Sequence, residues 1–277
     1  MTGTGLSALG FHDDWEETTR VIEESEHKEI LPFGPYRHVS VCEDESGACI
    51  GFIETTDGMS TGVFTVHGQG GLNVKAWQIW PGIAELSICD EDGALVTKVA
   101  AFVDDPFLYP QYDPKAVGEL AIFTDYQLGA IGLDVKIFDC EDDWVRSQEA
   151  SGETDVLLGP SFVASPWLFA LADGTASPQD VSPLAMFCAI CENVEVVTNS
   201  LTGKQWYKIS ANCAVPCTLA LPIDSQPAPR PGSIVSGKVF ITGSSGIWRE
   251  YEYSYGTPSS SSSTDTESEE KSEEQEN

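Results

Sequence analysis

The feature that most constrains this fold is the residue pattern from Arg37 onward. In this part of the chain, short runs rich in Val, Ile, Phe, Thr and Trp alternate with Gly, Asp and Pro. β-branched and aromatic side chains favour strands, and the interrupting residues favour turns. The runs follow one another without intervening helical periods, which indicates that successive strands pair as hairpins. The pattern therefore predicts a mainly β protein, built as an antiparallel sandwich or as barrel-like domains.

Four segments have the pattern of a hairpin, with two strands around a tight turn. In residues 38–55, a symmetric register about Glu45 and Ser46 would place Cys42 directly opposite Cys49. The other three hairpins are expected at residues 84–102, 193–210 and 237–255, and the last of these would place Tyr251, Tyr253 and Tyr255 on one face.

Two segments outside the β body differ in character. Residues 13–29 carry carboxylates in the first turns and His27 and Lys28 in the last, which predicts a short surface helix. Residues 257–277 contain no aromatic or aliphatic side chain, so we expect a disordered acidic tail. A proline-rich stretch suggests a boundary near residue 115, which gives four parts: an arm over 1–36, β domains over 37–115 and 116–256, and the tail.

The charge balance bears on the class of partner. Forty-four acidic against fourteen basic residues give a formal charge of -30 over 277 residues. Such a surface repels phosphate backbones, so nucleic-acid binding is not expected. The acidity is compatible with high solubility, basic protein partners, bound cations or a salty environment, and composition alone does not rank these. Neither a signal peptide nor an apolar run long enough to span a bilayer is visible. We therefore expect a cytoplasmic or virion protein with reduced cysteines and no membrane insertion.

Four late cysteines pose the sharpest chemical question. They have the spacing C-x2-C-x21-C-x3-C, which resembles the paired knuckles of a structural zinc site. Their surroundings are apolar and strand-like, and free cysteine is among the most buried residue types. The interpretation we favour is four core residues and no cofactor. The first alternative is a zinc site with the ligands Cys188, Cys191, Cys213 and Cys217, and the second is a redox disulfide.

The candidate catalytic residues are a few histidines and a large number of acidic residues. His67, in "VHGQGG", is either a histidine at a strand end beside a flexible turn or a residue that lines a cleft. Paired carboxylates such as Asp104 and Asp105 occur repeatedly in this acidic chain, so no pair stands out. Neither a G-x-S-x-G elbow nor an H-E-x-x-H motif is present.

Three hypotheses about function follow. The favoured one is a non-enzymatic structural or interaction protein, a subunit or accessory protein of a larger assembly such as a virion or tail, which binds itself or other proteins. The second is a binding domain or enzyme stabilised by zinc on the four late cysteines. The third is a chaperone that attracts basic proteins with its acidic tail.

Overall fold

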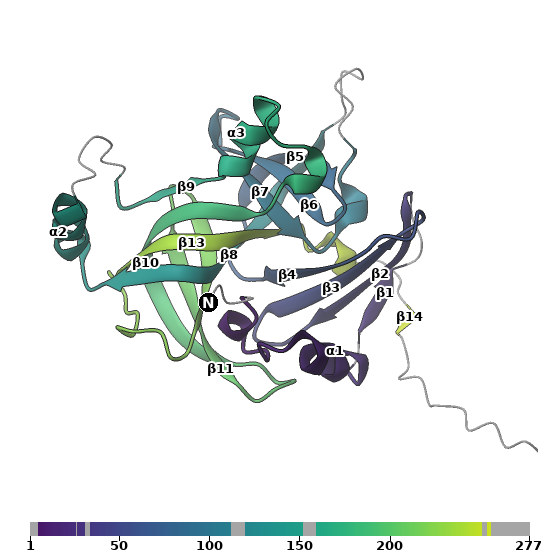
Figure 1. Cartoon of the computed structure of the whole chain (residues 1–277), viewed down its shortest axis with the longest axis horizontal. Coiled ribbons are helices and arrows are strands. Elements are labelled where there is room, and N and C mark those ends of the chain that lie inside the picture. Colours follow the sequence, from purple (N-terminus) through teal and green to yellow (C-terminus); the bar gives the residue numbers. More distant parts are fainter. Residues whose placement is uncertain are drawn as a thin grey trace, which may run out of the picture.

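The computed structural model describes residues 5–25, 27–30, 34–111, 120–151, 159–250 and 254–255. The fold is mainly β, as predicted, with two sheets and a short helix near the N-terminus (Figure 1). The smaller sheet has the order β14-β1-β2-β3-β4 and consists of β1 (Lys28–Ile30), β2 (Tyr36–Glu43), β3 (Ala48–Thr55), β4 (Ser60–Val66) and β14 (Ser254–Tyr255). The predicted disordered tail and most of the predicted tyrosine face lie outside the described residues.

The larger sheet has nine strands in the order β11-β12-β8-β5-β6-β7-β13-β10-β9. Its strands are β5 (Leu72–Trp80), β6 (Ile83–Cys89), β7 (Leu95–Val103), β8 (Ala121–Phe138), β9 (Phe162–Ala164), β10 (Leu184–Thr198), β11 (Gln205–Asn212), β12 (Pro216–Pro222) and β13 (Ile234–Ser244). Three α-helices accompany the sheets in the described residues: α1 (Trp15–Glu23), α2 (Glu141–Ser151) and α3 (Pro166–Ala172).

Two further pairings, β10 with β11 and β8 with β13, close the larger sheet on itself. The strands β8, β12, β11, β10 and β13 form one closed circuit, and β8, β5, β6, β7 and β13 form a second. A ring with an odd number of strands cannot be antiparallel throughout, because alternating directions do not match when the ring closes. Each circuit accordingly contains one parallel pair, β12 with β8 and β13 with β7, where the sequence pattern predicted antiparallel pairing alone.

The predicted hairpins at residues 84–102 and 193–210 are present as β6–β7 and β10–β11. The hairpin at residues 38–55 is present too, but its register differs by one residue from the prediction. Cys42 lies opposite Ile50, and Glu43 lies opposite Cys49. The cause is Gly47, whose φ of 93° lets the turn take an odd number of residues. Because a one-residue shift moves a side chain to the other face, Cys42 and Cys49 point away from each other.

The predicted hairpin at residues 237–255 is wrong. Strand β13 ends at Ser244, a short 3-10 helix follows (Ile247–Glu250), and β14 pairs with β1 in the smaller sheet. The glycine at position 246, with φ of 68°, turns the chain away from β13. This segment therefore links the two sheets instead of folding back on its own strand.

The predicted N-terminal helix is shorter than residues 13–29. Helix α1 begins after Asp14, whose carboxylate accepts a hydrogen bond from the Glu16 backbone N–H at 2.8 Å, and it ends at Glu23. Lys28 belongs to β1, where it pairs with Val41, so tertiary pairing outweighs local helix preference there. Figure 1 shows α1 beside β2–β4.

The two sheets pack closely near the end of β4, because the residue of β8 that faces Val66 there is a glycine and has no side chain. A Cβ atom on Gly129 of β8 would lie 2.6 Å from Val66 Cγ1 and 2.8 Å from the Val66 carbonyl oxygen.

Strands from both sides of residue 115 share the larger sheet, and the division of the chain into two β domains stays a prediction. None of the helices in the described ranges has both the length and the apolar character needed to cross a membrane.

Candidate functional site

A row of polar side chains crosses the smaller sheet where it meets the larger one. Glu43 on β2 lies opposite Cys49 on β3, and Cys49 lies opposite Thr65 on β4. Directly opposed residues share a face, and so do residues two apart on a strand, which places His67 beside Thr65 on the same side. The His67 backbone N–H donates to the Gly47 carbonyl at 2.8 Å and fixes the end of β4 to the β2–β3 turn.

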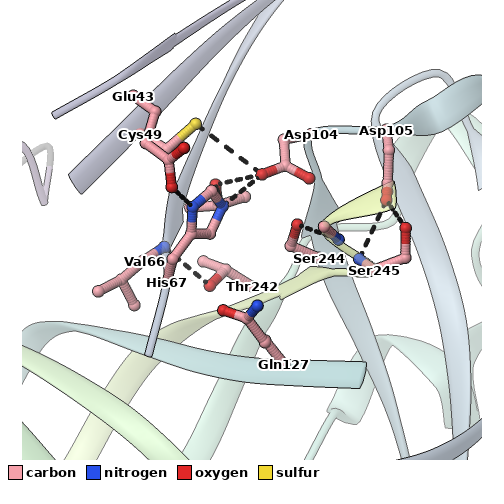
Figure 2. A network of polar contacts seen from close by, with 12 residues as sticks. Glu43, Cys49, Val66, His67, Asp104, Asp105, Gln127, Thr242, Ser244 and Ser245 are labelled. Carbon is pink, nitrogen blue, oxygen red and sulfur yellow. Dashed lines mark hydrogen bonds and ion pairs between the residues drawn. The ribbon is translucent and has the colours of Figure 1, made fainter. Parts of the chain in front are cut away.

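Asp104 approaches this row from the larger sheet, directly after the last residue of β7 (Figure 2). Its Oδ2 atom lies 2.5 Å from His67 Nε2, 3.0 Å from Thr65 Oγ1 and 3.8 Å from Cys49 Sγ. All of these side chains are removed from solvent, since Cys49 is 0% exposed, Asp104 1% and His67 5%. The site therefore brings a sulfur, a nitrogen and an oxygen together in a buried contact between the two sheets.

Glu43 holds the other ring nitrogen of the histidine. Its Oε1 atom lies 2.5 Å from His67 Nδ1, and Arg249 donates to both carboxylate oxygens, with Nε at 2.9 Å from Oε2. Burial alone would raise the pKa of Glu43, but hydrogen bonds from His67 and Arg249 outweigh it and lower this pKa to about 2. Burial would lower the pKa of His67, yet the charge of Asp104 raises it well above its usual value.

Cys49 is a neutral thiol in this setting. Burial raises its pKa to about 11. A nucleophilic cysteine needs a thiolate that a substrate can reach, together with a base that takes its proton. Here the sulfur is enclosed, and the two ring nitrogens of His67 face the carboxylates of Glu43 and Asp104. The arrangement suits a buried ligand set or an ionic contact better than it suits covalent catalysis.

Asp105 has a different partner from Asp104 and accepts a hydrogen bond from the Ser245 backbone N–H at 3.0 Å (Figure 2). Burial and the charge of Asp104 raise its pKa to about 7. Consecutive carboxylates at the end of β7 therefore serve two different contacts, with Asp104 facing the smaller sheet and Asp105 facing the residues after β13.

An open cleft of about 470 Å³ lies over His67. Charged side chains of both signs line it, among them Glu43, Glu45, Lys208 and Arg249. Lys208 Nζ donates to the Ser46 carbonyl at 2.8 Å, and burial lowers its pKa. His67 is therefore both a strand-end residue and a residue that lines a cleft, so the two readings of "VHGQGG" are compatible.

A larger hollow, about 1010 Å³, lies on the outer face of β5 and β6, beside helix α3. Trp77, Trp80 and Ile79 from β5 and Leu168 and Leu171 from α3 line it together with Leu120, which is 44% exposed. A few polar groups interrupt this apolar surface, among them Gln78, Asp57 and the ion pair of Glu85 with Lys98 at 2.8 Å. We refer to this hollow as the tryptophan groove.

The four late cysteines are all buried, at 0–1% exposure. Cys188 packs with Trp144 and Ile234, whereas Cys191, Cys213 and Cys217 belong to the main apolar core. Burial raises the pKa of Cys188 to about 11 and that of Cys191 to about 12. In the described part of the chain, a different group, Cys49, His67 and Asp104, has its donor atoms all within 4.8 Å. Zinc binding by the late cysteines stays a prediction.

Sequence reasoning found His67 but missed its partners. Asp104 was one of many acidic pairs, and Cys49 was assigned to a hairpin facing Cys42. One sequence signal for Asp104 was present. Asp104 and Asp105 directly follow the uninterrupted apolar run "VAAFV", which is expected to be a buried strand. A carboxylate at the end of such a strand is itself expected to be buried and to need a polar partner. Glu43 and Arg249 are 206 residues apart, so their contact depends on the tertiary fold.

Comparison with protein-family models, with curated proteins and with solved structures yields no match to this chain. The fold and the site thus define a mainly β protein in which two closed strand circuits share β8 and β13, with a buried Cys–His–Asp contact against a second sheet.

Proposed function

We propose that this chain is a non-enzymatic β-rich protein that binds another protein, as a subunit or accessory protein of a larger assembly. The tryptophan groove is the observation that carries this proposal. It combines about 1010 Å³ of open space with two tryptophans, several aliphatic side chains and a few polar groups. Buried aromatic anchors surrounded by polar groups are typical of the residues that dominate binding energy in protein interfaces.

The surface beside the groove supports the same proposal. Phe169 on α3 and Ile122 on β8 are each 70% exposed and add to the apolar surface. Apolar surface of this kind, next to a hollow, marks an interaction site more often than a random position on a monomer. The net charge of -30 favours a cationic partner, because opposite charge speeds the encounter of two proteins.

The test places a photo-crosslinking residue at Leu120, inside the groove, in the full-length chain within its source cells. The matched control places it at Val196, which is 51% exposed on β10, away from the groove. A partner that binds in the groove is crosslinked from position 120 and not from position 196. With that partner purified, Leu120→Asp is expected to weaken binding at least tenfold, about 1.4 kcal/mol, and Val196→Asp to leave it unchanged.

Two results would end this proposal. One is a chain that stays monomeric and gives no specific crosslink from position 120. The other is a partner whose affinity is the same for the Leu120→Asp variant and the wild type.

A further inference from the structure

The Cys49, His67 and Asp104 side chains have the composition of a transition-metal site. Their donor atoms, a sulfur, an imidazole nitrogen and a carboxylate oxygen, all lie within 4.8 Å of one another. Each comes from a different segment: β3, the end of β4 and the end of β7. We infer that these three residues bind one divalent metal ion of the zinc type between the two sheets.

An unpartnered oxygen supports this inference independently of the cluster's own hydrogen bonds. The Oδ1 atom of Asp104 is buried and has no hydrogen-bond partner among the described residues, although Asp104 is only 1% exposed. A buried carboxylate oxygen without a partner costs free energy unless a proton donor or a cation compensates it. The contacts of Asp104 with His67 and Cys49 are made by Oδ2, and Oδ1 points away from them (Figure 2). A metal ion therefore supplies that compensation when Asp104 turns to present Oδ1, alone or together with Oδ2, to the ion.

The outer contacts of His67 are those of a metal ligand. Histidines that bind metal through one ring nitrogen commonly present the other to a carboxylate, which fixes the orientation of the ring. Glu43 occupies that position at 2.5 Å from Nδ1. Arg249 holds Glu43 through both carboxylate oxygens, and its Nη2 atom also lies 2.6 Å from Nδ1. Nε2 is thereby directed toward Asp104 and is the nitrogen that binds the ion.

The donor set selects the class of metal. Calcium and magnesium are bound by oxygen atoms, whereas a thiolate, an imidazole and a carboxylate together suit zinc. Tetrahedral zinc would separate the sulfur and the carboxylate oxygen by about 3.5 Å and the nitrogen and that oxygen by about 3.3 Å. The present separations are 3.8 Å and 2.5 Å, so the Asp104 oxygen has to move about 0.8 Å away from His67 Nε2 to admit the ion. Three protein ligands leave the fourth position to water, beside the Thr65 hydroxyl.

The charges also balance. A Cys49 thiolate and the Asp104 carboxylate carry two negative charges, which match those of a divalent ion, while Glu43 and Arg249 neutralise each other. Binding replaces the thiol proton and any proton on His67 Nε2 by the metal, and both protons pass to solvent. The ion then joins β3 and β4 of the smaller sheet to the end of β7, so its structural effect is to hold the two sheets together.

The test uses the untagged full-length protein, purified under reducing conditions, with Zn²⁺ and Co²⁺ as probes. Native mass spectrometry is expected to show one zinc ion per chain, and X-ray absorption of that zinc is expected to show a single sulfur neighbour. The same measurement separates this site from the late cysteines, which would give four sulfur neighbours. Because it needs no variant, it remains decisive even where substitutions impair folding.

Variants assign the ligands. Glu43→Gln, which keeps the size of the side chain, is expected to weaken zinc binding 10- to 100-fold, and Cys49→Ser and Asp104→Asn are expected to weaken it further. Cys49→Ser also removes the sulfur-to-cobalt absorption band of the Co²⁺ protein. The matched control, Cys191→Ser, alters an equally buried cysteine and should keep the affinity and the band.

Three outcomes would overturn the inference. In one, the wild-type protein binds no zinc at a micromolar excess. In another, four sulfur atoms surround the bound metal. In the third, Cys191→Ser abolishes binding while folded Cys49→Ser retains it. None of these outcomes bears on the tryptophan groove, so the partner proposal is tested separately.

Discussion

Asp44 provides a sharp test of how the two sheets are joined. It sits in the β2–β3 turn, is 3% exposed, and accepts hydrogen bonds both from its own turn and from the β10–β11 turn. Oδ1 accepts from the Ser46 backbone N–H at 2.9 Å, and Oδ2 accepts from the Ser200 backbone N–H at 2.8 Å. Both serine hydroxyls donate to it as well. One carboxylate therefore ties the smaller sheet to the β10–β11 turn of the larger one.

The expected cost of Asp44→Ala follows from these contacts. The two hydroxyls can rotate toward other acceptors, but the two backbone N–H groups lose theirs, and each unsatisfied buried donor costs about 1–3 kcal/mol. The N–H of Ser200 is partly accessible to water, which places the sum at about 2–4 kcal/mol. With a urea m-value of about 3 kcal/mol/M, the unfolding midpoint should fall by about 1 M.

The assay is urea unfolding followed by far-UV circular dichroism and tryptophan fluorescence, with equal m-values required for the comparison. Asp57→Ala is the matched control, because Asp57 also accepts a hydrogen bond within a β turn but is exposed. It should shift the midpoint far less. Equal midpoints for Asp44→Ala and the wild type, or an equally large shift for Asp57→Ala, would refute the assignment of Asp44 as a link between the sheets.

Three further predictions concern pH, packing and thiol access. Burial tends to raise the pKa of Asp44, but hydrogen bonds from Ser200 and Ser46 lower it below the unfolded value of about 3.9. The carboxylate of Asp44 therefore contributes fully to the free energy of unfolding above about pH 3.9, and this contribution is lost as the pH falls through the folded pKa. The urea midpoints of the wild type and Asp44→Asn should converge on acidification. A constant gap between them from pH 7 to pH 3 would contradict this. Gly129→Ala places a Cβ atom against Val66 and Thr242 and should lower the free energy of unfolding by about 1–3 kcal/mol in chemical denaturation. Gly159→Ala has open space around it and should leave that free energy nearly unchanged. Equal effects of the two substitutions would show that the two sheets do not approach closely at Gly129. A thiol reagent should label exposed Cys140 rapidly in the native protein and buried Cys49 only on unfolding, and rapid labelling that persists in Cys140→Ser and maps to Cys49 would disprove its burial.

The two outcomes at the first hairpin show where sequence reasoning reaches its limit. The alternation of apolar residues in 38–55 was enough to predict two paired strands, because the side-chain period of a strand is local. The register was not predicted, because it depends on the left-handed conformation of Gly47, and several turn lengths fit the same letters. That single-residue difference decides whether Cys49 faces Cys42 or Asp104.

The sequence by itself determined the β character of the chain, two of its hairpins in full, the start of the N-terminal helix and the strand-end position of His67. These properties depend on neighbours within a few residues, and side-chain shape and periodicity report them directly. Tertiary structure alone decided the closure of two strand circuits on β8 and β13, the return of the chain to β1, and the meeting of Cys49, His67, Asp104 and Glu43. Such contacts join segments far apart along the chain, and their free energy comes from packing and desolvation that no local pattern records.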